Sequence, residues 1–140
     1  MNANLCISYL TIEHREEIPT KLRPRMGDWI FGCDICQIVC PWNKPGQQSP
    51  SILEALLPLG HLTTIDLIDE LGLSQEDFSA RFKGSPIKRA KRRGYLRNVA
   101  IALGNRGEKD ALPALEKALE EDEPLVSEAA NWALEIIKNK

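Results

Sequence analysis

Three of the four cysteines lie within eight residues, and no other feature constrains the chain as strongly. The segment is Cys33-x2-Cys36-x3-Cys40-Pro41. The same spacing forms the second half of a common iron–sulfur run, in which the cysteine before proline ligates a different cluster from its neighbours. Pro41 fixes the backbone immediately after Cys40 and removes an N–H donor that would compete for its sulfur. The spacing therefore predicts iron–sulfur ligation.

Two other interpretations of the cysteines stay open at this point. The first is that they are reduced thiols of the core, although buried thiols rarely repeat at ligand spacing. The second is that they bind a zinc ion. Zinc sites usually pair two Cys-x2-Cys units or add histidines, and neither His14 nor His61 is placed to complete one. Cys6 can supply a fourth thiolate to either metal. His14 itself lies in a polar run that favours a solvated turn over a ligand role.

The length and composition are ordinary and show no membrane anchor. The 140 residues suffice for one domain or for two small modules that share a core, and 43% of them are hydrophobic. No apolar run approaches the roughly 20 residues that span a bilayer. The N-terminus lacks the basic flank and long apolar core of a signal peptide. We therefore expect a reducing, cytoplasmic compartment, where clustered cysteines favour metal over disulfide.

The basic charge is gathered into one block, although the net charge is only −2. Residues 81–97 contain eight Lys or Arg and no Asp or Glu, whereas both flanking sequences are net acidic. A solvated helix face usually mixes the two signs, and like charges four apart repel by roughly a few tenths of a kcal/mol. The block therefore predicts a phosphate backbone as partner, with single-stranded RNA loops the usual target. The candidate contacts are Lys88, Arg89, Lys91, Arg92, Arg93 and Arg97.

The first 50 residues show few regular elements. Residues 5–12 are apolar and β-branched, which fits a strand or a tightly packed helix equally well. A short helix is predicted over 19–26, with a turn at Gly27. The polar stretch 45–50 has no core-forming residues and predicts a linker. The two expected units are residues 1–50, a partial dicluster segment, and residues 51–140, a helical region.

From residue 51 onward the pattern is helical, and most helices begin at a residue that can cap them. A capping side chain accepts a hydrogen bond from one of the first free N–H groups of the helix. Ser74 with Asp77 resembles a capping box, and Ser85-Pro86 starts a helix that runs to about Arg93, where Gly94 interrupts it. The other predicted helices are 52–57, capped by Ser51, 65–71, capped by Thr63 or Thr64, and 74–82, stopped by Gly84.

The last third has small, alanine-rich faces that allow helices to approach closely. Apolar residues repeat at helical spacing over 96–103, 111–119 and 126–137. We expect a tight turn over 104–107 and a break over 121–124. Two such helices resemble one HEAT-type repeat, which cannot bury its face alone and needs the preceding helices to pack on. The predicted fold is mainly α: a ferredoxin-like dicluster-binding segment followed by a helical HEAT-like repeat region.

Three phrases of the sequence carry a resemblance to a known family. They are Cys6-Ile-Ser-Tyr-Leu-Thr-Ile-Glu13, Gly32-Cys33-Asp-Ile-Cys36-Gln-Ile-Val-Cys40-Pro-Trp-Asn43, and Gly84-Ser-Pro-Ile-Lys-Arg-Ala-Lys-Arg-Arg-Gly94 with Leu96-Arg97-Asn98. On these phrases, nearly the whole chain resembles the C-terminal part of epoxyqueuosine reductase. The cysteine phrase with its Pro-Trp-Asn ending is specific to this family, and the upstream phrase makes the resemblance more specific still.

The resemblance implies a reaction and a set of cofactors. The family reduces epoxyqueuosine to queuosine in the wobble nucleotide of tRNA, and it is similar to reductive dehalogenases in using cobalamin and two 4Fe-4S clusters. By that resemblance, Cys6, Cys33 and Cys36 ligate one cluster and Cys40 ligates the other. The helical tail would hold the tRNA anticodon arm. By analogy, the neighbours of the corrin ring are Ser8, Asp34 and Gln37.

The chain departs from the family pattern at its N-terminus, because it begins just before Cys6. We expect the cobalamin-binding domain, the acidic proton donor and four further cysteines to lie outside it, in an upstream segment or a separate gene. Apolar surface should be exposed where that part docks. No catalytic residue is assigned, and the chain alone is not expected to catalyse the reaction. Two other functions stay open: a stand-alone ferredoxin-like electron carrier, and a zinc- or metal-stabilised RNA-binding module.

Overall fold

The structure, a computed structural model, describes residues 2–43 and 65–139, and the regular elements in these ranges are all helical. The α-helices are α1 (Ile7–Ile12), α2 (Ile35–Ile38), α4 (Leu67–Leu71), α5 (Gln75–Arg81), α6 (Lys91–Arg106), α7 (Leu112–Ala118) and α8 (Pro124–Lys138). Short 3-10 helices are η1 (Ala3–Leu5), η2 (Arg23–Met26), η4 (Pro86–Ala90) and η5 (Lys109–Ala111). The predicted mainly α fold is confirmed over these ranges. The predicted linker at 45–50, the helix at 52–57 with its Ser51 cap, and the caps Thr63 and Thr64 lie outside the described residues.

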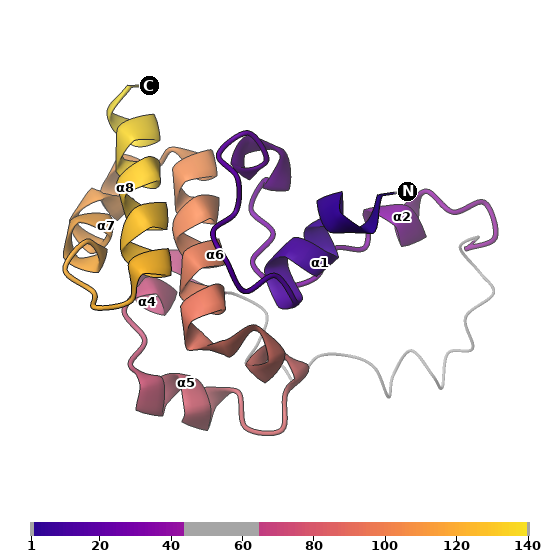
Figure 1. The fold of residues 1–140 in the computed structure, drawn as a ribbon, viewed down its shortest axis with the longest axis horizontal. Coiled ribbons are helices and arrows are strands. Elements are labelled where there is room, and N and C mark those ends of the chain that lie inside the picture. The colour runs from indigo at the N-terminus through magenta and orange to yellow at the C-terminus, as the bar shows by residue number, and fades with distance from the viewer. Residues whose placement is uncertain (1, 44–64, 140) are drawn as a thin grey trace.

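Helix α6 is the centre of the core, and Figure 1 shows it between α8 on one side and the N-terminal segment on the other. Every residue from Gly94 to Gly104 is buried. Because α6 is covered on all sides there, its sequence does not need the single apolar stripe of a surface helix. The helix therefore contributes polar side chains, as well as apolar ones, to the interior.

Gly104 lies inside α6, where the sequence predicted the start of a turn. A Cβ atom at this position would come within 2.9 Å of the Ala133 Cα atom and 2.8 Å of the Trp132 ring. The missing side chain therefore lets α6 and α8 approach closely. The turn falls at Gly107, which ends α6 in the left-handed conformation at a φ of 73°. The predicted turn at Gly104 is wrong, because a packing glycine and a turn glycine look alike in sequence.

The chain breaks before α6 at Lys91 and not at Gly94. Ser85 accepts a hydrogen bond from the Ile87 N–H at 3.3 Å, and Pro86 begins η4, so the predicted start is confirmed. Lys91 has a φ of 58° and a ψ of 161°, and from there α6 continues without interruption through Gly94. The predicted interruption at Gly94 is wrong, because glycine inside a helix weakens it without ending it when tertiary packing holds it.

Side-chain caps begin helices α4 and α5. Asp66 accepts a hydrogen bond from the Ile68 N–H at 2.8 Å, so α4 begins later than the predicted residue 65. The Ser74 hydroxyl accepts from the Asp77 N–H at 3.0 Å and donates to the Asp77 carboxylate at 2.7 Å. This confirms the predicted cap of α5. The predicted break before α8 is also confirmed, since α8 begins at Pro124.

The N-terminal segment is helical where the sequence left strand and helix equally open, because residues 7–12 form α1. The helix predicted over 19–26 is shorter than expected and is the 3-10 helix η2, after which Gly27 turns the chain at a φ of 58°. Arg23 is fully buried and donates to the Ile18 carbonyl at 2.8 Å and to the Glu128 carboxylate of α8 at 2.7 Å. The segment is therefore anchored to α8. No helix in the described ranges is long and apolar enough to cross a membrane.

Candidate iron–sulfur segment and nucleic-acid surface

All four cysteines carry free thiols and lie in the N-terminal segment. Cys6 immediately precedes α1, Cys33 comes just before α2, Cys36 lies within α2, and Cys40 follows it. Cys36 is exposed and the other three are half-buried. Figure 1 shows α2 and the start of the chain at the same end of the molecule, away from α8. None of the four is therefore a buried core cysteine.

Short-range hydrogen bonds shape the cysteine loop. The Cys40 N–H donates to the Gln37 carbonyl at 3.3 Å, which continues the turn of α2 up to Pro41. The Asn43 side-chain amide then donates to the Gln37 carbonyl at 3.0 Å and to its side-chain oxygen at 2.8 Å. These contacts curl the Pro-Trp-Asn ending back over α2. The backbone around Cys40 is therefore held against the end of α2.

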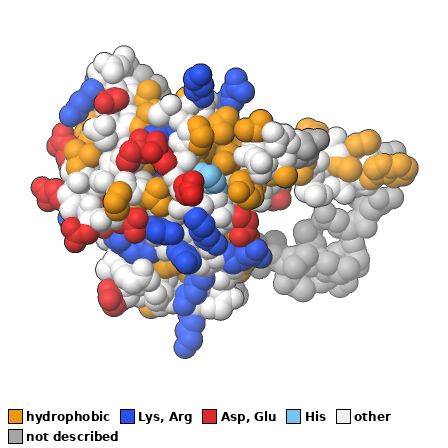
Figure 2. All heavy atoms as spheres, viewed as in Figure 1, with side chains coloured by type: hydrophobic (Ala, Val, Ile, Leu, Met, Phe, Trp, Pro, Cys, Tyr) orange, Lys and Arg blue, Asp and Glu red, His pale blue; other side chains and the backbone are white. Residues whose placement is uncertain are grey.

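An apolar surface surrounds this loop, and Figure 2 shows it as hydrophobic atoms on the extension at the right of the molecule. None of the four residues of α2 is buried. The exposed fractions are 47% for Ile35, 73% for Ile38, 71% for Val39 and 86% for Trp42. The loop therefore presents large apolar side chains to solvent beside the cysteines. We call these four residues the apolar rim.

The cysteines do not converge on a single point. Within residues 2–43 and 65–139, no group of three or more His, Cys, Asp or Glu side chains is placed to hold one metal ion. The described residues thus do not bring Cys6 together with Cys33 and Cys36 as a one-ion site. A donor set made only of thiols fits iron–sulfur clusters, whose thiolates each bond a different iron atom. The residues present therefore fit the group chemically, as a partial ligand set.

The basic block divides into buried and exposed residues, and Arg97 belongs to the first kind. It is 1% exposed and donates to the backbone carbonyls of Leu10 at 2.8 Å and Glu16 at 2.6 Å. Burial lowers the pKa of Arg97 to about 10, with nearby arginines adding to the effect. A buried guanidinium bonded to backbone cannot reach a phosphate. The prediction that Arg97 contacts tRNA is therefore corrected: it holds the N-terminal segment on α6.

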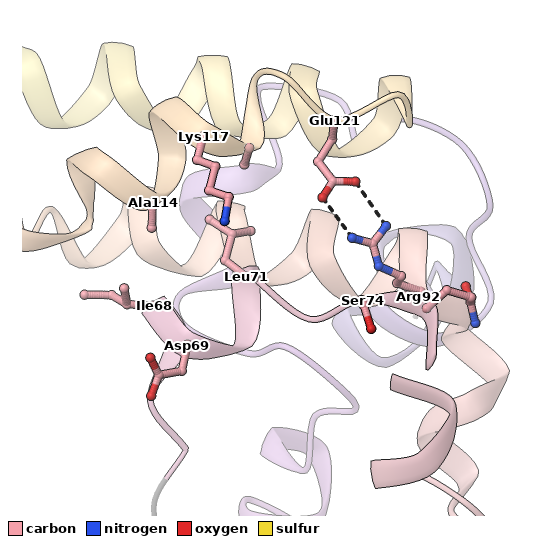
Figure 3. Close-up of a pocket in the computed structure, with 11 residues that line it drawn as sticks. Ile68, Asp69, Leu71, Ser74, Arg92, Ala114, Lys117 and Glu121 are labelled. Carbon is pink, nitrogen blue, oxygen red and sulfur yellow. Dashed lines mark hydrogen bonds and ion pairs between the residues drawn. The ribbon is translucent and has the colours of Figure 1, made fainter. Parts of the chain in front are cut away.

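Arg92 is also committed inside the protein. It donates to the Leu73 carbonyl at 2.7 Å. It also donates to both carboxylate oxygens of Glu121, at 2.9 and 3.1 Å, as Figure 3 shows. Its side chain is 16% exposed. A bidentate guanidinium–carboxylate pair of this kind is directional and strong. We therefore correct the prediction for Arg92 as well: its guanidinium binds Glu121 and joins the start of α6 to the end of α7.

Other members of the block have acidic partners that are distant in sequence. Arg81 pairs with Glu70 and Arg89 pairs with Glu13, although Arg89 stays 66% exposed and free to turn outward. These acids could not be predicted from the sequence, because no local spacing connects α4, the end of α1 and the end of α7 to residues 81–97. Only the fold brings these acids next to the basic block, where they neutralise part of its positive charge.

The remaining cations form a surface. Figure 2 shows Lys and Arg gathered across the lower part of the visible face, over η4 and the first turn of α6. Within the described residues and apart from the buried Arg97, the members of the block without an ion pair are Lys83, Lys88, Lys91 and Arg93. The first three are exposed and Arg93 is half-buried. Together with the exposed Arg89 they make up what we call the basic surface.

A cavity of about 580 Å³ lies beside the Arg92–Glu121 pair, between α4, α7 and the first turn of α6 (Figure 3). Lys117 extends toward Leu71 across it, and Asp69 lies at its edge. Among the site residues predicted from sequence, only Arg92 lines this cavity. The cavity is therefore separate from both the cysteine loop and the basic surface.

Comparison with known proteins connects these features to one family. Residues 1–43 match the family model described as a 4Fe-4S double cluster binding domain, and this range holds all four cysteines. The epoxyqueuosine reductase of Xanthomonas campestris is 41% identical over 135 residues, which are 96% of this chain and 38% of that protein. That of Escherichia coli is 39% identical over 134 residues, again 96% of this chain and 35% of that protein. The chain matches the C-terminal part of epoxyqueuosine reductases.

Solved structures of epoxyqueuosine reductases share the fold. The one from Streptococcus thermophilus has a TM-score of 0.85 at 30% identity, over 100% of this chain and 36% of that chain. A crystal structure of epoxyqueuosine reductase with an epoxyqueuosine-modified tRNA-Tyr stem loop has a TM-score of 0.84 at 29% identity, over 98% of this chain and 36% of that chain. The chain thus spans little more than a third of the length of the relatives that it matches.

These matches confirm the resemblance to epoxyqueuosine reductases and the dicluster segment predicted from the cysteine spacing. They do not favour the stand-alone electron carrier or the zinc-stabilised module. The assignment of each cysteine to a particular cluster stays a prediction, as do the phosphate contacts and the residues near cobalamin.

Proposed function

We propose that this chain is the electron-transfer and tRNA-binding part of an epoxyqueuosine reductase, acting in the cytoplasm on the last step of queuosine synthesis in tRNA. The observation that carries the proposal is the match of residues 1–43, with all four thiols, to a double-cluster domain. Matches to epoxyqueuosine reductases over 96% of the chain support it. The units proposed are a dicluster segment at 1–50 and a tRNA-binding region at 51–140.

The cysteines would serve two clusters. Cys6, Cys33 and Cys36 would ligate one cluster and Cys40 the other, because the cysteine before proline turns to the second cluster in this motif. The remaining thiolates would come from the N-terminal part of the enzyme, which would also bind most of the cobalamin. When bound, the clusters supply one-electron transfer to the corrin. The residues proposed to face the corrin are Ser8, Asp34 and Gln37, of which the last two are exposed.

The apolar rim would dock that N-terminal part. Trp42 is 86% exposed and Ile38 is 73% exposed, which is costly for large apolar side chains in water. A partner that supplied the other cluster ligands would necessarily lie against this loop. Covering the rim would also remove water from the clusters, which sets their reduction potential. The rim therefore supports a composite cluster site shared between two parts of one enzyme.

The basic surface would bind the tRNA anticodon arm. Lys88, Arg89, Lys91 and Arg93 are the contacts retained, because Arg92 and Arg97 are committed inside the protein. The related reductase structure with a tRNA stem loop supports this partner. Helices α6, α7 and α8 would act as one HEAT-like repeat that holds the surface rigid. Each phosphate neutralised would add about 0.7 to the salt slope of the binding constant, the value for single strands.

Anaerobic reconstitution of the chain with iron and sulfide tests the cluster proposal. We expect a brown protein with equal iron and sulfide and a reducible paramagnetic signal, lost when Cys33 and Cys36 are replaced by serine. Addition of the N-terminal part of a related reductase should raise the iron content, because it supplies the other thiolates. Tight zinc without colour, and no iron in either experiment, would contradict the proposal.

Gel-shift titration with tRNA tests the second half of the proposal. Charge reversal of three residues, Lys88→Glu, Lys91→Glu and Arg93→Glu, should abolish binding and flatten its salt dependence. A matched control reverses three exposed cations elsewhere, Lys21→Glu, Arg25→Glu and Lys109→Glu, and should retain most of the affinity. Equal losses in both triple variants would show that only net charge matters and that the basic surface is not the tRNA site.

A further inference from the structure

A polar network inside the protein connects α6 to both cysteine-bearing segments. Its centre is Asn98, which is fully buried. The Asn98 side-chain amide donates to the Thr11 carbonyl and the Ile30 carbonyl, each at 2.9 Å. Thr11 lies in the last turn of α1, the helix that follows Cys6, and Ile30 lies shortly before Cys33. One side chain of α6 therefore bonds the backbone of both cysteine-bearing segments.

Thr11 adds a second connection between the same two segments. Thr11 is 1% exposed, and its hydroxyl donates to the Ile7 carbonyl at 2.8 Å and accepts from the Gly32 N–H at 3.0 Å. Gly32 has a φ of 75°, a conformation that glycine adopts without strain, and it directly precedes Cys33. The hydrogen bond therefore fixes the last backbone group before the first cysteine of the loop.

Arg97 completes the network next to Asn98. Its guanidinium donates to the Asn98 side-chain oxygen at 3.0 and 3.1 Å, so both ends of that amide are bonded. It also donates to the Leu10 carbonyl in α1 and to the His14 carbonyl just beyond it. A buried polar network is stabilising only when its members are satisfied, and then it specifies one arrangement. This network specifies where α1 and the Cys33 loop sit on α6.

We propose that Thr11 and Asn98 are positioning residues that hold the Gly32–Cys33 backbone in a fixed place relative to α1, so that the two cysteine-bearing segments keep one arrangement before any cluster binds. The role of that arrangement in cluster binding rests on the proposed function, whereas the restraint on the loop does not. Partners beyond the ligands themselves orient ligands in this way in many metal sites. Because α6 also begins at the basic surface, the same helix fixes the cysteine loop relative to that surface.

Thr11→Val tests the proposal, with Thr11→Ser as the matched control. Valine keeps the shape and removes the acceptor for the Gly32 N–H, whereas serine keeps the hydroxyl. In the metal-free chain, we expect valine to speed hydrogen exchange of the Gly32 amide about tenfold. Alkylation of Cys33 should become several-fold faster relative to that of Cys36, which is exposed in either case. Serine should restore both rates to those of the unmodified chain.

The readouts distinguish positioning from general destabilisation. If valine leaves the Cys33-to-Cys36 alkylation ratio unchanged, or speeds all four cysteines by one factor, the positioning role is overturned. Reconstitution with iron and sulfide then tests the role in cluster binding. The Thr11→Val variant should retain less iron per chain, and the Thr11→Ser variant should retain as much as the unmodified chain. If even the unmodified chain retains no iron, the proposed function fails, while the alkylation ratio still decides whether Thr11 restrains the loop. Asn98→Leu, which leaves two carbonyls unpaired, should shift the same ratio further.

Discussion

Arg92 and Glu121 face each other with two parallel hydrogen bonds of 2.9 and 3.1 Å, although 29 residues separate them in the sequence. The pair joins the start of α6 to the end of α7 and forms one wall of the cavity in Figure 3. It shows that a block of positive charge without a local acid is not a uniformly positive surface once the chain has folded.

Glu121→Gln should weaken this junction and release a positive charge. We expect the free energy of unfolding to fall by about 1 kcal/mol, because Arg92 is half-buried and loses a charged partner. Binding to tRNA should strengthen slightly and become more salt-dependent, since Arg92 then adds to the basic surface. Urea unfolding and binding titrations at two salt concentrations measure the two effects.

The matched control for that variant is Glu116→Gln. Glu116 pairs with Lys138 at 3.3 Å, and both side chains are more than half exposed. Exposed pairs contribute little, so this change should hardly alter stability. Equal losses in the two variants would mean that the Arg92 pair has no special role in the fold.

Two glycines of α6 should respond in opposite ways to alanine. Gly104→Ala should destabilise the protein by about 1–3 kcal/mol, because its Cβ would lie within 2.9 Å of Ala133 and force α6 away from α8. Gly94→Ala should stabilise it by about 0.5–1 kcal/mol, because its Cβ would meet only the Ala90 side chain at 4.0 Å. Thermal or urea unfolding of both variants measures this contrast. Stabilisation by Gly104→Ala would show that the helices separate easily.

Lys91 combines backbone strain with a charge on the basic surface. Its φ of 58° and ψ of 161° define a backbone conformation that glycine adopts far more readily than lysine. Lys91→Gly should therefore raise the free energy of unfolding by about 1 kcal/mol and yet weaken tRNA binding. Lys91→Ala removes the same charge and keeps the strain, so it should weaken binding without stabilising the fold. Full tRNA affinity in either variant would remove Lys91 from the proposed contacts.

The Tyr95–Glu70 hydrogen bond of 2.8 Å should make stability depend on alkaline pH. Burial raises the pKa of Tyr95 well above its ordinary value, and the bond to Glu70 adds to the effect. The folded protein then keeps a proton that the unfolded chain loses above about pH 10, so stability falls as the pH rises beyond that value. Arg97, whose pKa is lowered to about 10, contributes a slope of the opposite sign.

Tyr95→Phe isolates the tyrosine contribution to that pH dependence. The arginine slope is present in both proteins and cancels in their difference. Between about pH 10 and 11.5 the difference in unfolding free energy should shrink by up to about 1.4 kcal/mol per pH unit. Urea unfolding of both proteins across this range measures it. Parallel curves would show that the phenol ionises as easily in the folded protein as in the unfolded chain.

Local chemistry determined much of this protein. The spacing of Cys33, Cys36 and Cys40 predicted an iron–sulfur segment because a metal cluster needs thiolates at short, fixed intervals. The caps at Ser74 and Ser85 and the break before Pro124 were equally predictable, because each depends on neighbours within one helical turn. Periodicity likewise predicted a mainly helical fold.

Only the tertiary structure decided which basic residues face solvent and which glycines turn the chain. Arg97 and Lys91 belong to the same charged block, yet one bonds backbone carbonyls in the interior and the other lies at the surface. Gly104 packs against α8, whereas Gly107 turns the chain. These outcomes depend on groups tens of residues away, because burial and pairing are set by the helices that α6 meets and not by the order of residues along it.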